Sequence, residues 1–165
     1  MKSKKIADQF ASTLCCELNR HKRSKLHWIP GKPIDFGPGH QAVDAIGYVR
    51  DRSRPAVLVE IERRRYSPVS NVIKVWAWCV RQKGEGGTYK KPTLIQAFSG
   101  FYSPKDSKRT LAVFAGEEMA KDGLARYVSL PFGYKPRKHA KNCEGACQRQ
   151  ARRLARRILK RVRAR

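Results

Sequence analysis

The stretch AVLVEIERR, residues 56–64, constrains the fold of this chain more than any other. Its aliphatic residues are those of a buried strand, yet it also contains Glu60 and Glu62. Because side chains alternate between the two faces of a strand, both glutamates point one way while Val57 and Val59 point the other. The aliphatic density predicts a central strand, in which two carboxylates on one face are stable only beside a cation.

The charge of the chain makes these carboxylates more unusual. The 165 residues contain 37 Lys and Arg against 13 Asp and Glu, a formal net charge of +24. Such an excess favours a polyanionic partner, with nucleic acid first and an anionic membrane surface second. No apolar stretch is long enough for a membrane span or a signal peptide, so we expect no integral membrane contact and a cytoplasmic location. Five cysteines without a disulfide-type spacing fit a reducing compartment.

Hydrophobic periodicity predicts an α/β domain with a mixed central β-sheet flanked by helices. The expected order is α-β-β-β-α-β-α-β, and the second and third strands look like a hairpin joined by the turn signal DRSRP. The expected helices cover residues 4–20, 72–80 and 107–121, and the expected strands cover residues 25–29, 42–50, 56–64, 93–102 and 125–134.

The helix that follows the central strand has an apolar stripe with helical spacing, made of Val72, Val75, Trp76, Cys79 and Val80. This stripe predicts that Trp76 fills the core. Trp78 lies off the stripe, so it is either partly buried or available to stack on a base.

From residue 135 the composition becomes strongly basic, which predicts a domain over residues 1–134 and a basic tail over 135–165, helical from about residue 147. Apolar residues at helical spacing, such as Leu154 and Ile158, would dock one side of this helix. The opposite side would then present a basic face to nucleic-acid phosphates. That basic face consists of Arg152, Arg153, Arg156, Arg157, Lys160 and Arg161.

A third carboxylate joins the two glutamates if the hairpin forms. Asp44 stands near the start of the preceding strand, sixteen residues before Glu60, and the turn returns it to the same end of the sheet. Three clustered carboxylates suit a hard cation such as Mg²⁺ or Mn²⁺. In a protein built for phosphates, such a cation would activate water against a phosphodiester.

The segments VDAIGYV and VLVEIE, with the expected order of elements, resemble the PD-(D/E)xK nuclease superfamily of restriction-endonuclease-like proteins. The likeness covers roughly residues 4–130. It implies an α-β-β-β-α-β core and hydrolysis of phosphodiester bonds, with DNA a more favoured substrate than RNA. It further implies that Asp44 and Glu60 bind the metal, and that Glu17 in the leading helix assists them.

The chain departs from that superfamily at one important position, because Glu62 stands where the motif has a Lys. Some members carry Glu there, and a Lys can come from the following helix, where Lys74 is the candidate. Glu62 or Lys74 would then orient or deprotonate the attacking water. Gln96, on the strand over 93–102, would lie beside the site or bond locally. His40 would assist catalysis or have no role.

Three interpretations of the function therefore remain. The first is a Mg²⁺- or Mn²⁺-dependent endonuclease. The second is a non-catalytic nucleic-acid-binding or assembly protein, favoured by Glu62 at the Lys position. Membrane association through the basic tail is a third, and a homodimer is left open.

Overall fold

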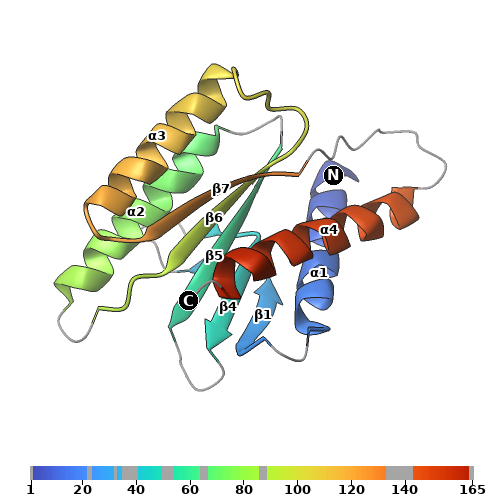
Figure 1. Ribbon diagram of the computed structural model, residues 1–165, viewed down its shortest axis with the longest axis horizontal. Coiled ribbons are helices and arrows are strands. Elements are labelled where there is room, and N and C mark those ends of the chain that lie inside the picture. Colours follow the sequence, from blue (N-terminus) through green and yellow to red (C-terminus); the bar gives the residue numbers. More distant parts are fainter. Residues whose placement is uncertain are drawn as a thin grey trace.

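A computed structural model describes residues 2–21, 24–31, 33–34, 41–49, 54–63, 67–85, 89–132 and 143–163 of the chain (Figure 1). The elements in chain order are α1 (Lys2–Asn19), β1 (Leu26–Pro30), β2 (Pro33–Ile34), β3 (Gln41–Ala42), β4 (Ala45–Val49), β5 (Pro55–Glu62), α2 (Pro68–Gly84), β6 (Thr93–Phe98), α3 (Ser107–Lys121), β7 (Arg126–Pro131) and α4 (Cys143–Arg163). The predicted α/β class and order of main elements are thereby confirmed. The sequence did not predict the short pair β2–β3.

The main sheet is mixed and open, with the strand order β1-β4-β5-β6-β7. β1, β4 and β5 are antiparallel neighbours, whereas β5, β6 and β7 are parallel. β5 is therefore the central strand and the place where the sheet changes from antiparallel to parallel. Both the central position of this strand and the predicted hairpin, β4–β5, are confirmed.

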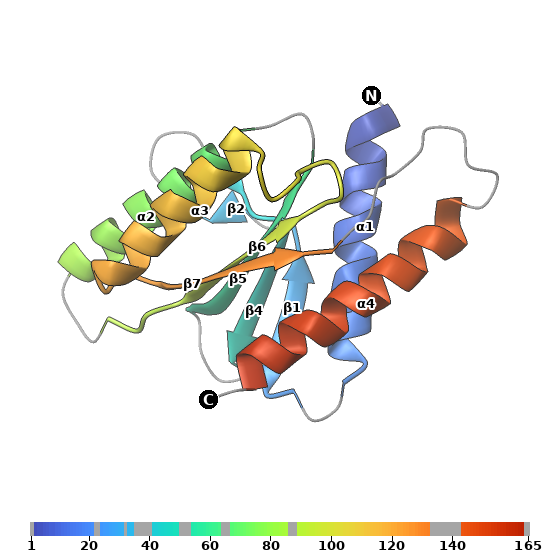
Figure 2. The same cartoon turned by 45° about the horizontal axis from the view of Figure 1, so that its top comes forward.

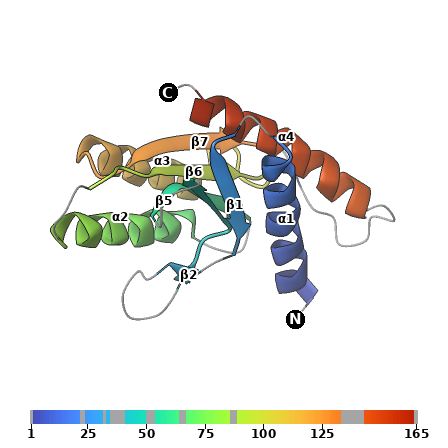
Figure 3. The ribbon, with the colours of Figure 1, turned by 90° about the horizontal axis from the view of Figure 1, so that it is seen from below.

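Helices cover both faces of the sheet, as Figures 1 and 3 show. On one face, α1 and α4 pack against β5 residues Val57, Val59 and Ile61. On the other face, α2 and α3 enclose a second core with Leu58. Alternation along β5 thus divides its side chains between two hydrophobic clusters, and the glutamates share the α2 face.

The helix ends follow the sequence locally. α3 begins after Asp106, whose side chain accepts hydrogen bonds from the backbone N–H groups of Lys108 and Arg109 at 2.9 and 3.2 Å. This is the N-cap arrangement that satisfies free amides in the first turn. α2 begins with Pro68 in its first turn, where the missing N–H costs nothing.

The predicted apolar stripe of α2 was right at Val72, Val75 and Cys79, which are buried, and wrong at Trp76 and Val80. Trp78 is buried in the α2–α3 core with 7 % of its surface exposed, whereas Trp76 is only partly buried. Polar contacts explain why Trp78 is buried. Asn71 and Lys74 lie on the same side of α2 as Trp78, and they contact the glutamates of β5, so this side faces the sheet. A prediction from hydrophobic spacing alone leaves out Asn71 and Lys74, because both are polar.

The basic C-terminal segment contains the long helix α4, which lies across α1 (Figure 2). Its residues Ala151, Leu154, Ala155, Ile158 and Leu159 are buried in the same cluster as α1 and β5. The docking of a helix by its apolar stripe is confirmed, and this stripe is part of the core. The expected domain boundary at residue 134 lies outside the described residues and stays a prediction.

Within the described ranges, no helix is long and apolar enough to cross a membrane.

Candidate active site at the centre of the sheet

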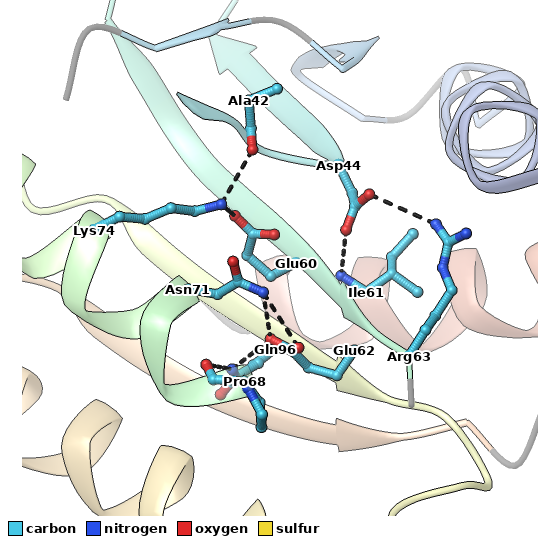
Figure 4. A network of polar contacts seen from close by, with 10 residues as sticks. All are labelled: Ala42, Asp44, Glu60, Ile61, Glu62, Arg63, Pro68, Asn71, Lys74 and Gln96. Carbon is cyan, nitrogen blue, oxygen red and sulfur yellow. Dashed lines mark hydrogen bonds and ion pairs between the residues drawn. The ribbon is translucent and has the colours of Figure 1, made fainter. Parts of the chain in front are cut away.

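The register of the β4–β5 hairpin brings Asp44 beside the glutamates. Ala45 pairs with Val59, so Asp44, one residue before β4, lies next to Glu60 across the ladder. Its Oδ2 accepts a hydrogen bond of 2.7 Å from the backbone N–H of Ile61, which takes the place of the next ladder bond (Figure 4). The predicted approach of Asp44 to the glutamate strand is therefore found.

Asp44 is the most accessible of these acids. Its carboxylate lies 3.7 Å from the Arg63 guanidinium, and both side chains are about a quarter exposed, at 27 % and 24 %. Solvent consequently reaches the group from the side of Asp44 and Arg63. The ion pair is long and partly exposed, so its contribution to stability is small.

Glu60 is buried and makes a close ion pair. Lys74 reaches it from α2, with 2.6 Å between Nζ and Oε1, and Nζ also donates to the Ala42 carbonyl at 3.1 Å (Figure 4). The side chains of Lys74 and Glu60 are only 10 % and 4 % exposed. A cation from the helix thus meets the carboxylate of the central strand.

Glu62 is held by neutral amides. Its Oε1 accepts from Gln96 at 2.6 Å and from Asn71 at 3.1 Å, and its Oε2 accepts from Asn71 at 3.2 Å. Gln96 is itself fixed, because it donates to the Pro68 carbonyl and accepts from the Tyr127 hydroxyl, both at 2.7 Å. Glu62 is therefore the anchor of a buried hydrogen-bond network that joins β5, α2, β6 and β7.

Burial dominates the electrostatics of both glutamates. Desolvation raises the pKa of Glu60 well above its usual range; Lys74 opposes this effect, while Asp44 and Glu62 reinforce it. Desolvation also raises the pKa of Glu62, against the hydrogen bonds from Gln96 and Asn71. The cations and donors of the protein therefore offset only part of the cost of burying two carboxylates.

Glu17 does not join this group. It lies on α1, which covers the opposite face of the sheet, and its oxygens are 2.5 Å from Arg20 and 3.2 Å from Arg152. Glu17 therefore links α1 to α4. The position of Glu17 in the sequence could not predict its contact with Arg152, because Arg152 lies 135 residues further along the chain.

No group of three or more His, Cys, Asp or Glu residues in the described part of the chain is arranged to hold a metal ion. The three-acid cluster expected from the sequence is thus not assembled. Asp44 and Glu60, however, form a donor set that suits Mg²⁺, which proteins commonly hold through one or two carboxylates together with water. Glu60 is also buried at the start of this group, and a cation beside it would lower the cost of that burial further than Lys74 alone does.

Sequence reasoning missed Asn71 and Tyr127 as members of the network. Asn71 could have been found, since it precedes Lys74 by one helical turn on the same side of α2. Tyr127 gave no such signal, because its approach to Gln96 depends on the pairing of β6 with β7. Of the two expectations for Gln96, the position beside the site is the one found, because its side chain donates to Glu62. His40 lies outside the described residues.

The six residues of the predicted basic face are exposed on α4, opposite its buried stripe. Two of them have internal contacts: Arg152 binds Glu17, and Arg157 donates to the Pro131 carbonyl. Because α4 packs on the α1 face of the sheet, this basic surface and the acids lie on opposite faces.

Comparisons with protein-family models, with curated proteins and with solved structures found no match for this chain.

Proposed function

We propose that this protein is a divalent-metal-dependent hydrolase of nucleic-acid phosphodiester bonds, with DNA as its substrate. The observation that carries the proposal is the buried ion pair between Lys74 and Glu60 of the central strand, with Asp44 beside it. In this proposal the site is of the PD-(D/E)xK kind, with its lysine supplied from α2 and with Glu62 at the usual lysine position.

A purely structural role explains the pair poorly. Burying an ion pair contributes little stability compared with apolar residues of similar size, because desolvation cancels much of the attraction. Titratable groups that are buried, coupled and shifted are concentrated at functional sites. Here Glu60 and Lys74 pair beside Asp44, and Glu62 binds amides, in a chain with only 13 acidic residues and a net charge of +24.

Asp44 and Glu60 would hold Mg²⁺ or Mn²⁺, which would polarise the phosphodiester and help to ionise the attacking water. Lys74 Nζ, which donates to Glu60, would donate to that water or to a phosphate oxygen once substrate is bound. Arg63, on the accessible side of Asp44, would contact the phosphate backbone.

Between the two candidates for the catalytic group, the hydrogen bonds favour Lys74. Both oxygens of Glu62 accept hydrogen bonds from Asn71, and one also accepts from Gln96, so Glu62 has little capacity left for water. We assign Glu62 a positioning role, in which it fixes the end of β5 against α2.

The basic face of α4 would bind backbone phosphates of the same nucleic acid. Its six cations are exposed, and they lie on the face of the sheet away from Lys74. Contacts there would add sequence-independent affinity and would take no part in the chemistry.

The test is cleavage of duplex DNA in Mg²⁺ or Mn²⁺ by the wild type, Asp44→Asn, Glu60→Gln and Lys74→Met. We expect each variant to lose at least about 100-fold in rate, because each removes charge at the reacting phosphate. Lys105→Met and Asp122→Asn, which change exposed residues elsewhere, should cut as the wild type does. A wild-type protein that leaves DNA and RNA intact with both metals would contradict the proposal.

The second candidate is a non-catalytic nucleic-acid-binding protein. Glu62 at the motif lysine position and the lack of a three-acid cluster among the described residues favour it. It predicts salt-dependent binding to nucleic acid that neither Mg²⁺ nor Glu60→Gln changes, and no cleavage.

A further inference from the structure

The ammonium group of Lys74 lies against oxygen atoms of the candidate site. Its Nζ is 2.6 Å from Glu60 Oε1 and 3.1 Å from the carbonyl oxygen of Ala42, and Asp44 binds the same stretch of β5 (Figure 4). Carboxylate and carbonyl oxygens are also the ligands that hard divalent cations prefer. The protein therefore places a cation of its own at a position that suits Mg²⁺ or Mn²⁺.

Lys74 and a divalent ion would compete for Glu60. The side chains of Lys74 and Glu60 are only 10 % and 4 % exposed, so water screens little of the repulsion between two cations on this carboxylate. A divalent ion carries twice the charge of the ammonium, and it would offset the burial of Glu60 more strongly than Lys74 does. Binding of the ion therefore favours movement of Nζ away from Glu60.

Lys74 can move without a change of the fold. Its ammonium is carried by a flexible four-carbon chain, whereas α2 itself is held to Glu62 through Asn71, one turn earlier. Ala42 is exposed, and the side chain of Asp44 is 27 % exposed. Nζ thus has a path toward solvent or substrate on the side of these two residues.

We propose that Lys74 is a tethered competitor of the metal, which occupies the cation position on Glu60 until Mg²⁺ or Mn²⁺ displaces it. This inference rests on the proposed function, because the displaced Nζ is the group that would donate to the attacking water or to a phosphate oxygen. Metal binding would therefore release the lysine for the reaction. Without metal, the ion pair with Glu60 keeps Lys74 out of use.

Calorimetric titration of the full chain with Mn²⁺, without DNA and in mildly alkaline buffer, tests the competition. Lys74→Met keeps a long side chain and removes the ammonium. We expect it to bind Mn²⁺ at least about 10-fold more tightly than the wild type, because a neighbouring charge commonly changes the ionisation of a carboxylate by that factor or more. Equal or weaker binding of Mn²⁺ by folded Lys74→Met would overturn the proposal.

Two further variants locate the effect. Lys121→Met removes a lysine that pairs with Glu118 at 2.5 Å on the exposed side of α3, and it should bind Mn²⁺ as the wild type does. Addition of Glu60→Gln to Lys74→Met should abolish the tighter binding. If that double variant still binds Mn²⁺ tightly, the ion lies elsewhere and the proposal is wrong.

Thermal unfolding shows whether Lys74→Met is folded, since the substitution leaves a buried carboxylate without its cation. Added Mn²⁺ should raise the unfolding temperature more in Lys74→Met than in the wild type, because a ligand that binds the folded state stabilises it according to its affinity. A smaller rise in the variant than in the wild type would count against the competition.

Chemical labelling tests the displacement in the wild-type chain, without any substitution. An acetylating reagent for amines should modify Lys74 slowly in the absence of metal, because its side chain is buried, and several-fold faster with Mn²⁺. Lys121, whose side chain is 72 % exposed, should react equally fast in both conditions. Peptide mass spectrometry gives both rates. Labelling of Lys74 that Mn²⁺ slows or leaves unchanged would overturn the proposal.

None of these measurements contains DNA, so their outcomes separate the two proposals. If Mn²⁺ displaces Lys74 but no nucleic acid is cut, the hydrolase proposal alone fails. If nucleic acid is cut while Mn²⁺ leaves the labelling of Lys74 unchanged, the competition alone fails.

Discussion

Glu60 and Glu62 share one face of β5, yet their partners differ in kind. A cation, Lys74, meets Glu60, whereas the amides of Asn71 and Gln96 meet Glu62. Burial raises the pKa of both carboxylates, and at Glu62 the amide donors offset only part of this effect. The protonation state of the Glu62 side chain therefore changes the free energy of unfolding directly.

We expect the unfolding free energy, measured with a chelator present, to fall as the pH rises above about 4.5, the ordinary pKa of a Glu side chain. The pKa of Glu62 is raised in the folded state, so above the ordinary value the folded protein binds more protons than the unfolded one. The stability that protonation of Glu62 gives is lost as the pH rises through the pKa that Glu62 has in the folded protein.

Glu62→Gln should flatten this dependence, since the amide cannot ionise. At neutral pH it should alter stability relative to the wild type in the favourable direction, by about 1 kcal/mol for each pKa unit removed. Glu85→Gln, at an exposed carboxylate, is the matched control. An unchanged pH profile in Glu62→Gln would contradict the prediction. The measurement is urea unfolding across the pH range.

Gly116 permits the close packing of α3 on β7. A Cβ built there would lie 2.4 Å from the Tyr127 ring, while one at Gly84 would have no atom within 4 Å. Gly116→Ala should therefore destabilise the protein by about 1–3 kcal/mol and displace Tyr127 from Gln96. Gly84→Ala, at the end of α2, should be neutral. Equal melting temperatures for the two variants would show that the ring can move freely.

At the scale of elements, α4 completes one hydrophobic layer. Ala151, Leu154, Ala155, Ile158 and Leu159 cover α1 and the back of β5, and Arg152 reaches Glu17 from the same helix. So many like charges would destabilise α4 alone. Its stability thus depends on packing, which removes the apolar stripe from water.

Ile158→Ala should lower the unfolding free energy by about 2–5 kcal/mol, because Ile158 is fully buried and the substitution leaves a cavity. Arg153→Ala, on the exposed side of the same helix, should change stability by no more than about 0.5 kcal/mol. Chemical denaturation measures both. A small effect of Ile158→Ala would indicate that α4 is dispensable to the core.

The elements themselves could largely be predicted from the sequence. Alternation identified β5 and its two faces, and turn residues identified the β4–β5 hairpin. Local pattern could not predict the contacts between distant segments: Glu17 with Arg152, Gln96 with Tyr127, or the rotation of α2 that buries Trp78. These depend on how layers pack. In the candidate site, strand register predicted the approach of Asp44 to Glu60, whereas Lys74 became a candidate through the resemblance to the PD-(D/E)xK nucleases.

At the scale of the whole molecule, two of the described helices differ in charge. α4, on the α1 face of the sheet, carries eight basic side chains and one acidic side chain, whereas residues 106–122, on the other face, carry four acidic and three basic side chains. The field of α4 therefore attracts polyanions to the α1 face.

Binding to duplex DNA should weaken steeply with salt, and the slope of log K against log salt should fall in magnitude by about 0.9 for each phosphate contact removed. Glutamine at Arg153, Arg156, Lys160 and Arg161 should reduce the slope and leave the metal dependence of cleavage unchanged. Fluorescence anisotropy measures the slope. The same slope in this variant and in the wild type would remove α4 from the binding surface.

The packing of α1 on α4 bears on the order in which the protein matures. Leu14 and Leu18 of α1 share one hydrophobic cluster with Leu154 and Ile158 of α4. During synthesis, the ribosome must release more than a hundred residues after α1 before α4 can complete this cluster. Until then we expect a nascent chain to expose that part of α1 to chaperones.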